Sequence, residues 1–451
     1  MLKWVRNSFT IIGAVVVSWF LIGGVSLALH AEDRYAGLQL FAKVLNLVQQ
    51  YYVEPVDTQK LLNGGIKGML KELDPHTNYL PKQIYKEFES ETSGEFPGIG
   101  VEITLKEGIL TVISSVEDTP AWKAGVKAGD KIVEIDGEST KGLSLVEAAQ
   151  KMRGKRGSKV KLAIFRDGFK EPQNFEITRG VVKLKSVKYA NLEDGYAYVK
   201  LTSFIETTFS ELTKAIKRHE KKQKDLKGLI IDLRKNPGGL LDQAVKVSDL
   251  FLEKGKIVST IGRDKKQEEI IYANKKETKV GFPIVILIDE YSASASEIVA
   301  GAMQDNKRAL IMGQRSFGKG SVQSVVKLGD GSGLKLTVAR YYTPSGKSIQ
   351  AQGVQPDVII DKLDPKVIKE ALVTKPVRRE KDIKGHLKAD RSDKDKKPNN
   401  DHLAYWWLQS DVKETDLSPK AKLLRNDFQV LQAYNYLKAW KVIQGFGTAG
   451  I

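Results

Sequence analysis

The sequence of 451 residues contains no cysteine, and this absence removes several classes of chemistry at once. Disulfide bonds, thiolate nucleophiles and cysteine-based zinc sites all need a thiol. Lipid attachment to a lipoprotein cysteine is excluded for the same reason. A chain without cysteine is unaffected by an oxidising compartment, so the composition is compatible with export without requiring it.

Histidine is also scarce, with five residues in the whole chain. None of them lies beside a serine or an aspartate in a nucleophile-elbow setting, and the sequence has no Gly-x-Ser-x-Gly motif. His219 falls in a lysine-rich amphipathic segment, where we expect it to be solvated. A Ser-His-Asp triad and a histidine-based metal site are therefore not expected, and nothing in the sequence calls for a cofactor or a metal.

Basic residues outnumber acidic ones by 72 to 55, which gives a formal net charge of +17. A nucleic-acid partner is one interpretation of such an excess. The lysines are scattered among Asp and Glu, without zinc-ligand spacing or an aromatic RNA-binding signature. We therefore favour a solvated basic surface and no nucleic-acid partner, and attraction to anionic envelope polymers or lipid head groups stays compatible with the charge.

The single long apolar run of the chain lies at its N-terminus, within residues 1–30. Lys3 and Arg6 precede an apolar stretch from Phe9 to Leu29, and the small residues at its end suit a signal peptidase. The run is also nearly long enough to span a bilayer, so a cleaved signal peptide and a retained anchor both stay open. Either one places the rest of the chain outside the cytoplasm.

A helical region is predicted over residues 31–94. Apolar side chains recur at helical spacing between residues 34 and 54, and a second helix is expected from Thr58 to Leu73. Such a leading segment, outside any obvious core, suits either oligomerisation or plain packing. It allows a homodimer that forms through these helices.

Residues 95–180 have a different pattern, in which short strands are punctuated by glycine. A helix is expected to begin after Ser144, whose hydroxyl forms a capping box with Glu147. These features predict one small β-rich module.

Residues 181–362 alternate apolar strands with helices, which is typical of an α/β core. Residues 363–416 are rich in Lys, Asp and Pro, which indicates a charged linker. Helical periodicity returns within residues 417–451, where we expect a small C-terminal helical element.

A serine cluster after an apolar strand offers a nucleophile. The strand Ile284–Ile288 is followed by a polar loop and by a predicted helix, Ala295–Asp305, that begins directly after Ser294. The unpaired N–H groups at the start of a helix suit a developing oxyanion. Serine is also a preferred N-cap, so a capping role and a catalytic role fit this segment equally well when it is considered alone.

A catalytic serine without a histidine needs another base, and Lys319 is the candidate. Gly318 and Gly320 flank it and allow another element to approach this backbone closely. A desolvated lysine amine has a lowered pKa and can accept the serine proton. The segment also resembles a phosphate-binding P-loop, but Gly320 stands where Ser or Thr should bind magnesium, and a strand pattern follows in place of a helix.

A third segment, Ile230–Gly239, consists of a buried strand that runs into an Asn-Pro-Gly-Gly turn. The exposed N–H groups of a Gly-Gly turn can help to bind an oxyanion. A tight connection between a strand and a helix explains the turn equally well in isolation.

In this order and spacing, the three segments resemble the carboxy-terminal processing peptidases, also known as tail-specific proteases. Ser294-Ala-Ser-Glu297 is similar to the nucleophile motif of that family, and Phe317-Gly-Lys-Gly320 is similar to its base motif. Asp74-Pro-His-Thr77 is similar to a third family segment, with Thr77 where serine is more usual. The resemblance implies an α/β protease core, a crotonase- or Clp-like spiral of strands and helices, flanked by helical N- and C-terminal elements.

The same resemblance implies a role for each site residue. Ser294 would attack the peptide carbonyl, Lys319 would act as general base and then as general acid, and Gln323 would orient the lysine amine. The backbone N–H groups of Ala295 and Gly238 would bind the oxyanion.

The β-rich module resembles a PDZ domain inserted ahead of the core. The loop residues that would bind a substrate are Gly98, Ile99, Gly100 and Val101. A substrate tail would add as a strand beside this loop, with its terminal carboxylate on the loop N–H groups. Arg153, just after the groove helix, could bind that carboxylate, latch the module to the core, or be an ordinary surface arginine.

The resemblance favours a serine endopeptidase that binds proteins or peptides by their C-termini, in the periplasm or on the outer face of a bacterial inner membrane. An envelope adaptor is a further candidate partner. The alternative is a PDZ-bearing tail-binding scaffold or chaperone with an inactive protease-like core. An acyl-CoA enzyme on a crotonase-like core is a third interpretation, which the PDZ module and the exported N-terminus weaken.

Overall fold

The structure, a computed structural model, describes residues 35–193, 195–223, 225–276, 278–363, 383–387, 415 and 417–447. The predicted signal peptide or anchor and nearly all of the predicted charged linker lie outside the described residues. Within these ranges, no helix combines the length and the apolar character that a membrane crossing requires. The chain forms two compact units, residues 1–81 with 325–336 and residues 82–324 with 337–451.

The described part of the first unit is mostly helical. A helix over residues 35–51 and helix α2 (Thr58–Lys71) agree with the two predicted helices. Helix α2 begins after Asp57, whose carboxylate accepts a hydrogen bond from the Gln59 N–H and so satisfies one unpaired donor of the first turn. The short strand β1 (Asn78–Leu80) pairs antiparallel with the first residues of β18 (Gly333–Tyr342).

The predicted β-rich module is a sheet with the strand order β3-β4-β5-β7-β8, in which β6 pairs with β5. Its strands are β3 (Val101–Lys106), β4 (Ile109–Ser115), β5 (Lys131–Ile135), β6 (Glu138–Ser139), β7 (Lys159–Phe165) and β8 (Gln173–Thr178). Two helices complete it, α4 (Pro120–Lys123) and α5 (Leu145–Met152). The capping box between Ser144 and Glu147 is confirmed. The module has an apolar core of its own, centred on Ile132, Leu162 and Ile164.

The strands that directly precede and follow the module in the sequence pair with each other and form a two-stranded stem. Strand β2 (Glu95–Gly98) pairs antiparallel with β9 (Gly180–Lys183). Helix α3 (Lys82–Ser93) precedes the stem; it lies in the helical region predicted over residues 31–94, but it was not predicted as a separate helix. Its sequence is rich in Lys and Glu, and Tyr85 is its one buried residue, so the apolar periodicity of a helix is weak there.

The α/β core is built on a second sheet with the strand order β10-β11-β12-β15-β16-β19. Its strands are β10 (Val187–Glu193), β11 (Tyr196–Leu201), β12 (Gly228–Asp232), β15 (Ile284–Ile288), β16 (Leu310–Gly313) and β19 (Val358–Ile359). All neighbours in this sheet are parallel except β10 and β11. Strands β12 and β15 are buried at every position, as their continuous apolar sequences predict for parallel strands covered on both faces.

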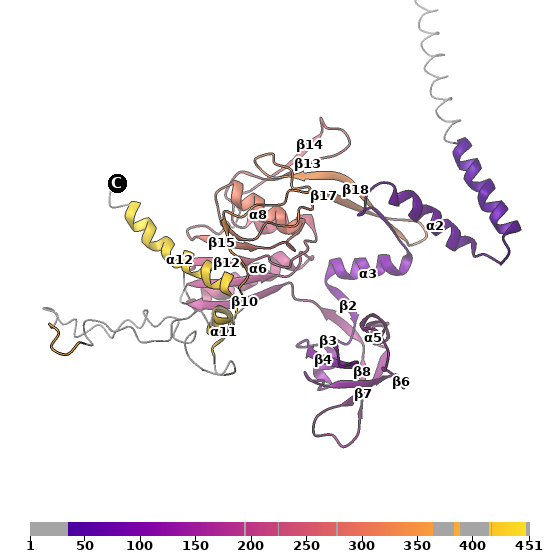
Figure 1. The fold of residues 1–451 in the computed structure, drawn as a ribbon, viewed down its shortest axis with the longest axis horizontal. Helices are drawn as coiled ribbons and strands as arrows, with labels where there is room; N and C mark the ends of the chain where they lie inside the picture. The colour runs from indigo at the N-terminus through magenta and orange to yellow at the C-terminus, as the bar shows by residue number, and fades with distance from the viewer. Residues whose placement is uncertain are drawn as a thin grey trace, which may run out of the picture. The chain divides into compact units, whose positions relative to one another are not determined.

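Helices cover both faces of this sheet (Figure 1). On one face α6 (Thr208–Gln223), α7 (Leu241–Asp249) and α8 (Ala295–Asp305) pack into a large apolar cluster. On the other face α11 (Pro419–Asn426) and α12 (Phe428–Gly447) pack into a second cluster. Along β12, Leu229 and Ile231 belong to the first cluster and Ile230 to the second, because side chains alternate between the faces of a strand. The predicted C-terminal helical element is thus two helices that cover one face of the core.

Outside these layers, β13 (Lys256–Ile261) pairs with β14 (Glu268–Tyr272) and with the last residues of β18, and β17 (Ser321–Lys327) also pairs with β18.

The prediction that His219 is solvated is wrong. Its side chain lies on the inner face of α6, is 1% exposed, and has its Nδ1 2.6 Å from the Tyr189 hydroxyl. Helix α6 packs on β10, so the lysines that dominate its composition lie on the opposite face. Burial lowers the pKa of His219 because it disfavours the charged imidazolium.

Candidate active site

Ser294 lies at the sharp turn that joins β15 to α8. Its φ of 54° and ψ of −112° are unusual for a residue with a side chain, and such strain is found most often at functional sites. Ser294 is partly exposed, whereas Ala293 and Ala295 on either side of it are buried. The turn therefore presents one serine at the surface of an otherwise packed helix start.

The neighbouring serines have structural partners. The Ser292 hydroxyl donates to the Leu233 carbonyl at 2.9 Å, and the Ser296 hydroxyl donates to the Asn236 carbonyl at 3.0 Å. Both side chains are fully buried. They tie the nucleophile turn to the segment after β12, which leaves Ser294 as the serine that is accessible for chemistry.

Lys319 lies in the turn between β16 and β17, and its residue is partly buried. A Cβ atom at Gly320 would lie 2.4 Å from the Gln350 nitrogen, and one at Gly318 would lie 3.2 Å from the Ala351 Cα, with Gly318 at a φ of +92°. The predicted close approach of another element is therefore confirmed. A strand, β17, follows the lysine, so the turn does not have the helix that a P-loop requires.

Glu297 joins the serine and lysine turns. Its Oε2 accepts hydrogen bonds from the backbone N–H groups of Ser294 at 2.7 Å and of Lys319 at 2.9 Å. Its Oε1 accepts from the Gly318 N–H and the Ser316 hydroxyl, each at 2.6 Å. One buried carboxylate thus brings the backbones of Ser294 and Lys319 to a single oxygen atom.

The sequence indicated Glu297 only as the last residue of the nucleophile motif, three positions after the serine. That spacing is also typical of a capping box, which would have predicted its bond to the Ser294 N–H but not its bonds to the lysine turn. Burial acts to raise the pKa of Glu297, against the four hydrogen bonds that act to lower it, and the pKa is raised.

The segment after β12 lies directly against the nucleophile. A Cβ atom at Gly238 would lie 2.7 Å from the Ala293 carbonyl oxygen and 2.9 Å from the Ser294 Cβ, and Gly238 has a φ of +101°. No residue with a side chain fits there without displacing the serine turn. The Gly238 N–H, which the resemblance assigns to the oxyanion, donates to the Asn236 Oδ1 at 2.9 Å in this structure. The oxyanion assignment of Gly238 therefore requires that Asn236 release this N–H.

Gln323 follows the lysine turn on β17. Its Nε2 donates to the hydroxyl of Ser321 at 2.7 Å and to the Ser321 carbonyl at 3.2 Å. The amide nitrogen is thus held by its own strand, and the bond by which Gln323 would orient Lys319 stays a prediction.

The predicted carboxylate-binding loop contains a glycine in a conformation that other residues rarely adopt. Gly100 has a φ of +84°, and a Cβ there would lie 2.4 Å from the Thr119 Cβ, so the loop requires glycine. Strand β3, which follows the loop, forms an edge of its sheet. Arg153 is exposed beside the loop, with its guanidinium carbon 5.3 Å from the centre of the Phe96 ring. In the described chain it forms no ion pair, so the latch and the carboxylate roles are not distinguished by its contacts.

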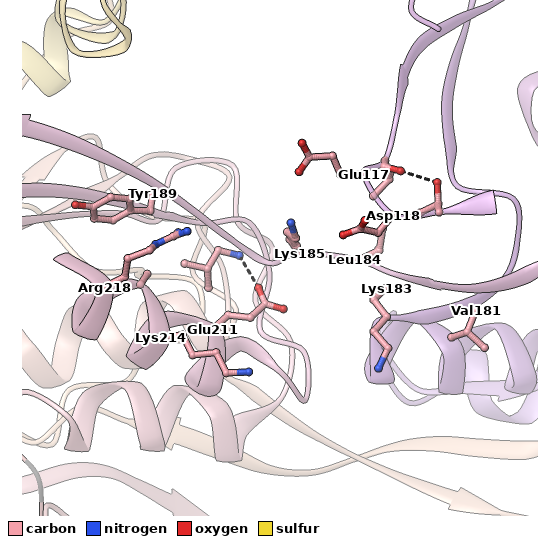
Figure 2. A pocket seen from close by; sticks show the side chains of 14 residues that line it. Glu117, Asp118, Val181, Lys183, Leu184, Lys185, Tyr189, Glu211, Lys214 and Arg218 are labelled. Carbon is pink, nitrogen blue, oxygen red and sulfur yellow. Dashed lines mark hydrogen bonds between the residues drawn. The ribbon is translucent and has the colours of Figure 1, made fainter. Parts of the chain in front are cut away.

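A separate cavity of about 710 Å³ lies where the stem, the turn before α4 and α6 meet (Figure 2). Its charged side chains are Glu117, Asp118, Lys183, Lys185, Glu211, Lys214 and Arg218. The Glu211 carboxylate accepts hydrogen bonds from the Ser186 and Val187 N–H groups, which fixes the chain after the stem to α6. The lining of this cavity lacks a serine and lysine pair like the one that Glu297 joins. Among the residues that the structure describes, no group of three metal-binding side chains converges.

Similar proteins identify the family. The model of peptidase family S41 matches residues 195–360, a PDZ domain model matches residues 111–166, and the model named activating protease CtpB N-terminal domain matches residues 27–84. A carboxy-terminal-processing protease of Bartonella bacilliformis is 45% identical over 366 residues, which span 80% of this chain and 82% of that protein. The chain belongs to the carboxy-terminal processing proteases of peptidase family S41.

This protease is therefore a serine-type peptidase with a PDZ domain, as the sequence predicted. Carboxy-terminal processing protease CtpA of Bacillus subtilis is 37% identical over 353 residues, which span 77% of this protease and 75% of that protein. Among solved structures, the photosystem II D1 C-terminal processing protease has 32% identity and a TM-score of 0.43, over 72% of this chain and 92% of that chain.

Proposed function

We propose that this protease is an endopeptidase of the cell envelope that captures the C-terminal tails of protein substrates and cleaves them with a Ser294–Lys319 dyad. The observation that carries the proposal is the shared acceptor, since the Ser294 and Lys319 N–H groups both donate to Glu297 Oε2. In our proposal, this shared oxygen holds the backbone of the nucleophile, Ser294, close to the backbone of the base, Lys319.

In the proposed reaction, the Lys319 amine accepts the proton of the Ser294 hydroxyl as Oγ attacks the peptide carbonyl carbon. The resulting oxyanion is stabilised by the Ala295 N–H, at the start of α8, and by the Gly238 N–H once Asn236 releases it. Collapse of the tetrahedral species breaks the C–N bond, and the lysine ammonium donates its proton to the leaving amine.

Water then hydrolyses the acyl-enzyme. Lys319 accepts a proton from the water as it attacks the ester carbonyl, and returns it to Ser294 Oγ when the C–O bond breaks. Gln323 would keep the lysine amine directed at Oγ throughout. The cycle consumes one water and needs no cofactor or metal.

We assign capture of the substrate tail to the PDZ loop Gly98–Val101 and to the edge strand β3. An extended peptide can add to an edge strand through main-chain hydrogen bonds, with its terminal carboxylate on the N–H groups of the loop. Arg153 beside the loop supplies a positive charge for that carboxylate. The dyad and the tail site then act on the same substrate chain, the PDZ domain holding its end while cleavage occurs upstream.

The test is hydrolysis of a reporter protein that ends in an apolar tail. Ser294→Ala and Lys319→Ala should each abolish cleavage while binding of the tail peptide stays unchanged. Ser210→Ala and Lys246→Ala change an exposed serine and an exposed lysine and should have no effect. Undiminished cleavage by either dyad variant would refute the dyad.

A tail-binding scaffold or chaperone with an inactive core is the second candidate. The observation in its favour is the Gly238 N–H, which donates to Asn236 and so is not presented to a substrate in this structure. Tail binding by the wild-type protein without any hydrolysis would support this candidate and contradict the endopeptidase.

Location and assembly complete the proposal. The apolar segment within residues 1–30 would export the protein to the periplasm or anchor it on the outer face of the inner membrane, where an envelope adaptor could bind it. The helix over residues 35–51 exposes apolar side chains, among them Leu38, Phe41, Val44 and Leu47, which suit a homodimer. Membrane fractionation tests the first assignment, and sedimentation of a Phe41→Glu variant tests the second.

A further inference from the structure

The C-terminal helices are connected to the segment beside the nucleophile through one buried arginine. Arg234, two residues after β12, donates from Nη1 and Nη2 to the two Asp427 carboxylate oxygens at 2.9 and 2.6 Å. Its Nη1 also donates to Gln429 Oε1 at 2.8 Å. Asp427 lies between α11 and α12, and Gln429 lies in the first turn of α12. The Arg234 guanidinium thus binds two residues that follow it by 193 and 195 positions in the sequence.

The other side of the same guanidinium is held by Asp232. Arg234 donates from Nε and Nη2 to the Asp232 carboxylate at 2.9 and 2.7 Å, and the Tyr198 hydroxyl donates to it as well. Asp232 is fully buried, and the Arg234 side chain is 11% exposed. A bidentate ion pair in such surroundings has a fixed geometry, since departure of either partner would leave a buried charge unpaired.

Burial acts to raise the pKa of Asp232, but Arg234, Lys200 and Tyr198 more than offset it, and the pKa is lowered. The ionised form of Asp232 is thus the one that its surroundings favour, which is the form that the ion pair with Arg234 needs.

Arg234 is directly connected to the nucleophile turn along a short stretch of backbone. Next to it, the Lys235 N–H donates to Asp289 in the loop after β15. The Asn236 carbonyl then accepts from the Ala293 N–H, one residue before Ser294. Gly238 follows, where an added Cβ atom would lie 2.9 Å from the Ser294 Cβ. The backbone that carries Arg234 therefore continues, through hydrogen bonds at each step, into the turn that faces Ser294.

We propose that Asp427 and Gln429 are positioning residues, which hold Arg234 and thereby fix the turn Asn236–Gly239 against the Ser294 turn for catalysis. This inference rests on the proposed function, because the turn is the one to which the oxyanion is assigned. It gives the C-terminal helices a role in the reaction in addition to covering one face of the core.

Packing alone does not need this contact, since the helix pair already has an apolar core. Leu424 and Tyr434 are each 1% exposed within the cluster that joins α11 and α12 to the sheet. That cluster can hold the helices in place without an ion pair to Arg234. The charged contact adds a fixed direction and distance, which an apolar cluster does not specify.

The test uses Asp427→Asn in the full-length protein, with Leu424→Ala as the matched control. Asp427 Oδ1 also accepts from the Val430 N–H, and asparagine caps a helix about as well as aspartate, so the variant keeps the cap and removes the charge that faces Arg234. Leu424→Ala loosens the same helices through their apolar core. Asp427→Glu keeps the charge and should restore part of any loss.

Two quantities are measured for each variant at a temperature where it is fully folded. The first is kcat and KM on the tail-bearing reporter, for which we expect Asp427→Asn to lower kcat about tenfold with KM unchanged, and Leu424→Ala to leave kcat unchanged. The second is hydrogen exchange of the Asn236, Gly238, Gly239 and Leu240 amides, which should accelerate in Asp427→Asn and not in Leu424→Ala.

A wild-type kcat and unchanged exchange in Asp427→Asn would overturn the inference. So would losses of kcat that follow the melting temperatures of both variants alike, because they would reduce the contact to ordinary stability. Hydrogen exchange separates this inference from the proposed function, since faster exchange confirms the clamp on the turn even if the wild-type protein cleaves nothing.

Discussion

Glu297→Gln is the substitution that most sharply tests how the Ser294 and Lys319 turns, which we propose to be catalytic, are held together. The carboxylate has two acceptor oxygens, and each receives two hydrogen bonds. A glutamine amide keeps one oxygen and presents an NH2 group in place of the other. With the NH2 group in the place of Oε2, the Ser294 and Lys319 N–H groups both face a donor in this buried site. With the NH2 group in the place of Oε1, the Gly318 N–H faces a donor, while the Ser316 hydroxyl can turn to accept.

The magnitude follows from these unsatisfied donors. An unsatisfied buried donor costs about 1–3 kcal/mol, so with one or two of them we expect the free energy of unfolding to fall by about 1–4 kcal/mol, at the lower part of the possible range. The lower part is chosen because burial raises the pKa of Glu297, and the neutral amide removes the cost of keeping a buried charge. The protein should stay folded at 25 °C, since domains are stable by about 5–15 kcal/mol.

The effect on activity should exceed the effect on stability. In either orientation of the amide, the lysine turn loses at least one of its bonds to residue 297, so the serine and lysine turns can separate. Displacements of about 1 Å can reduce a rate about a hundredfold. We therefore expect kcat on the tail-bearing reporter to fall at least tenfold, with tail binding unchanged. Steady-state kinetics and thermal unfolding of the same samples measure both quantities.

Glu211→Gln is the matched control. Glu211 also accepts several hydrogen bonds, from the Ser186 and Val187 N–H groups and the Thr207 hydroxyl, but it lies on α6 and contacts neither catalytic turn. It should lose stability and keep kcat. A wild-type kcat for Glu297→Gln, or an equal loss of kcat in both variants, would refute the role assigned to Glu297.

Two further substitutions test individual contacts. Gly238→Ala should abolish activity, because the new Cβ atom would lie within 3.0 Å of atoms of Ala293 and Ser294. Gly281 has a similar positive φ, and a Cβ atom there meets no atom within 4 Å, so Gly281→Ala should keep activity and cost only about 1 kcal/mol of stability. Equal activity of the two variants would contradict the close approach at Gly238. His219→Gln should flatten the pH dependence of the melting temperature. Burial lowers the pKa of His219, so as the pH falls below about 6.5 the unfolded chain binds a proton that the folded chain does not, and the stability of the wild-type protein falls with the pH. The control His386→Gln, which changes an exposed histidine, should retain that pH dependence. An unchanged pH dependence of the melting temperature in His219→Gln would contradict the assignment.

Several helices and strands of the core could be predicted because their apolar pattern and the polar residues that bound them indicate the same secondary structure. Helix α8 has the predicted bounds, and β15 is the predicted apolar run between polar loops. Elements with a mixed pattern were missed, among them α3 and β14, whose sequence Glu-Glu-Ile-Ile-Tyr is only partly buried. The error at His219 has the same origin, since composition describes a whole helix and burial is decided by one face of it.

The sequence indicated site residues as chemical types, and their contacts could not be predicted from it. The scarcity of histidine and the glycines around Lys319 favoured a serine and a lysine, whose catalytic roles stay predictions. Nothing local indicates that Glu297 also binds the lysine turn, 22 positions away, or that Arg234 meets a residue 193 positions away. The first contact arises because the parallel strands β15 and β16 bring the turns that follow them to one edge of the sheet, and the second because α11 and α12 pack on a face of that sheet. Both follow from topology and not from periodicity.

The central claim is that Ser294 is a nucleophile activated by Lys319, and covalent labelling tests it most directly. A fluorophosphonate that reacts with activated serines should modify the wild-type protein at Ser294 alone, as located by mass spectrometry of the digested chain. Lys319→Ala, which keeps the serine and removes the base, should label at least a hundredfold more slowly, as expected for loss of a general base. Labelling of another serine, or equal labelling of Ser294 without Lys319, would contradict the account.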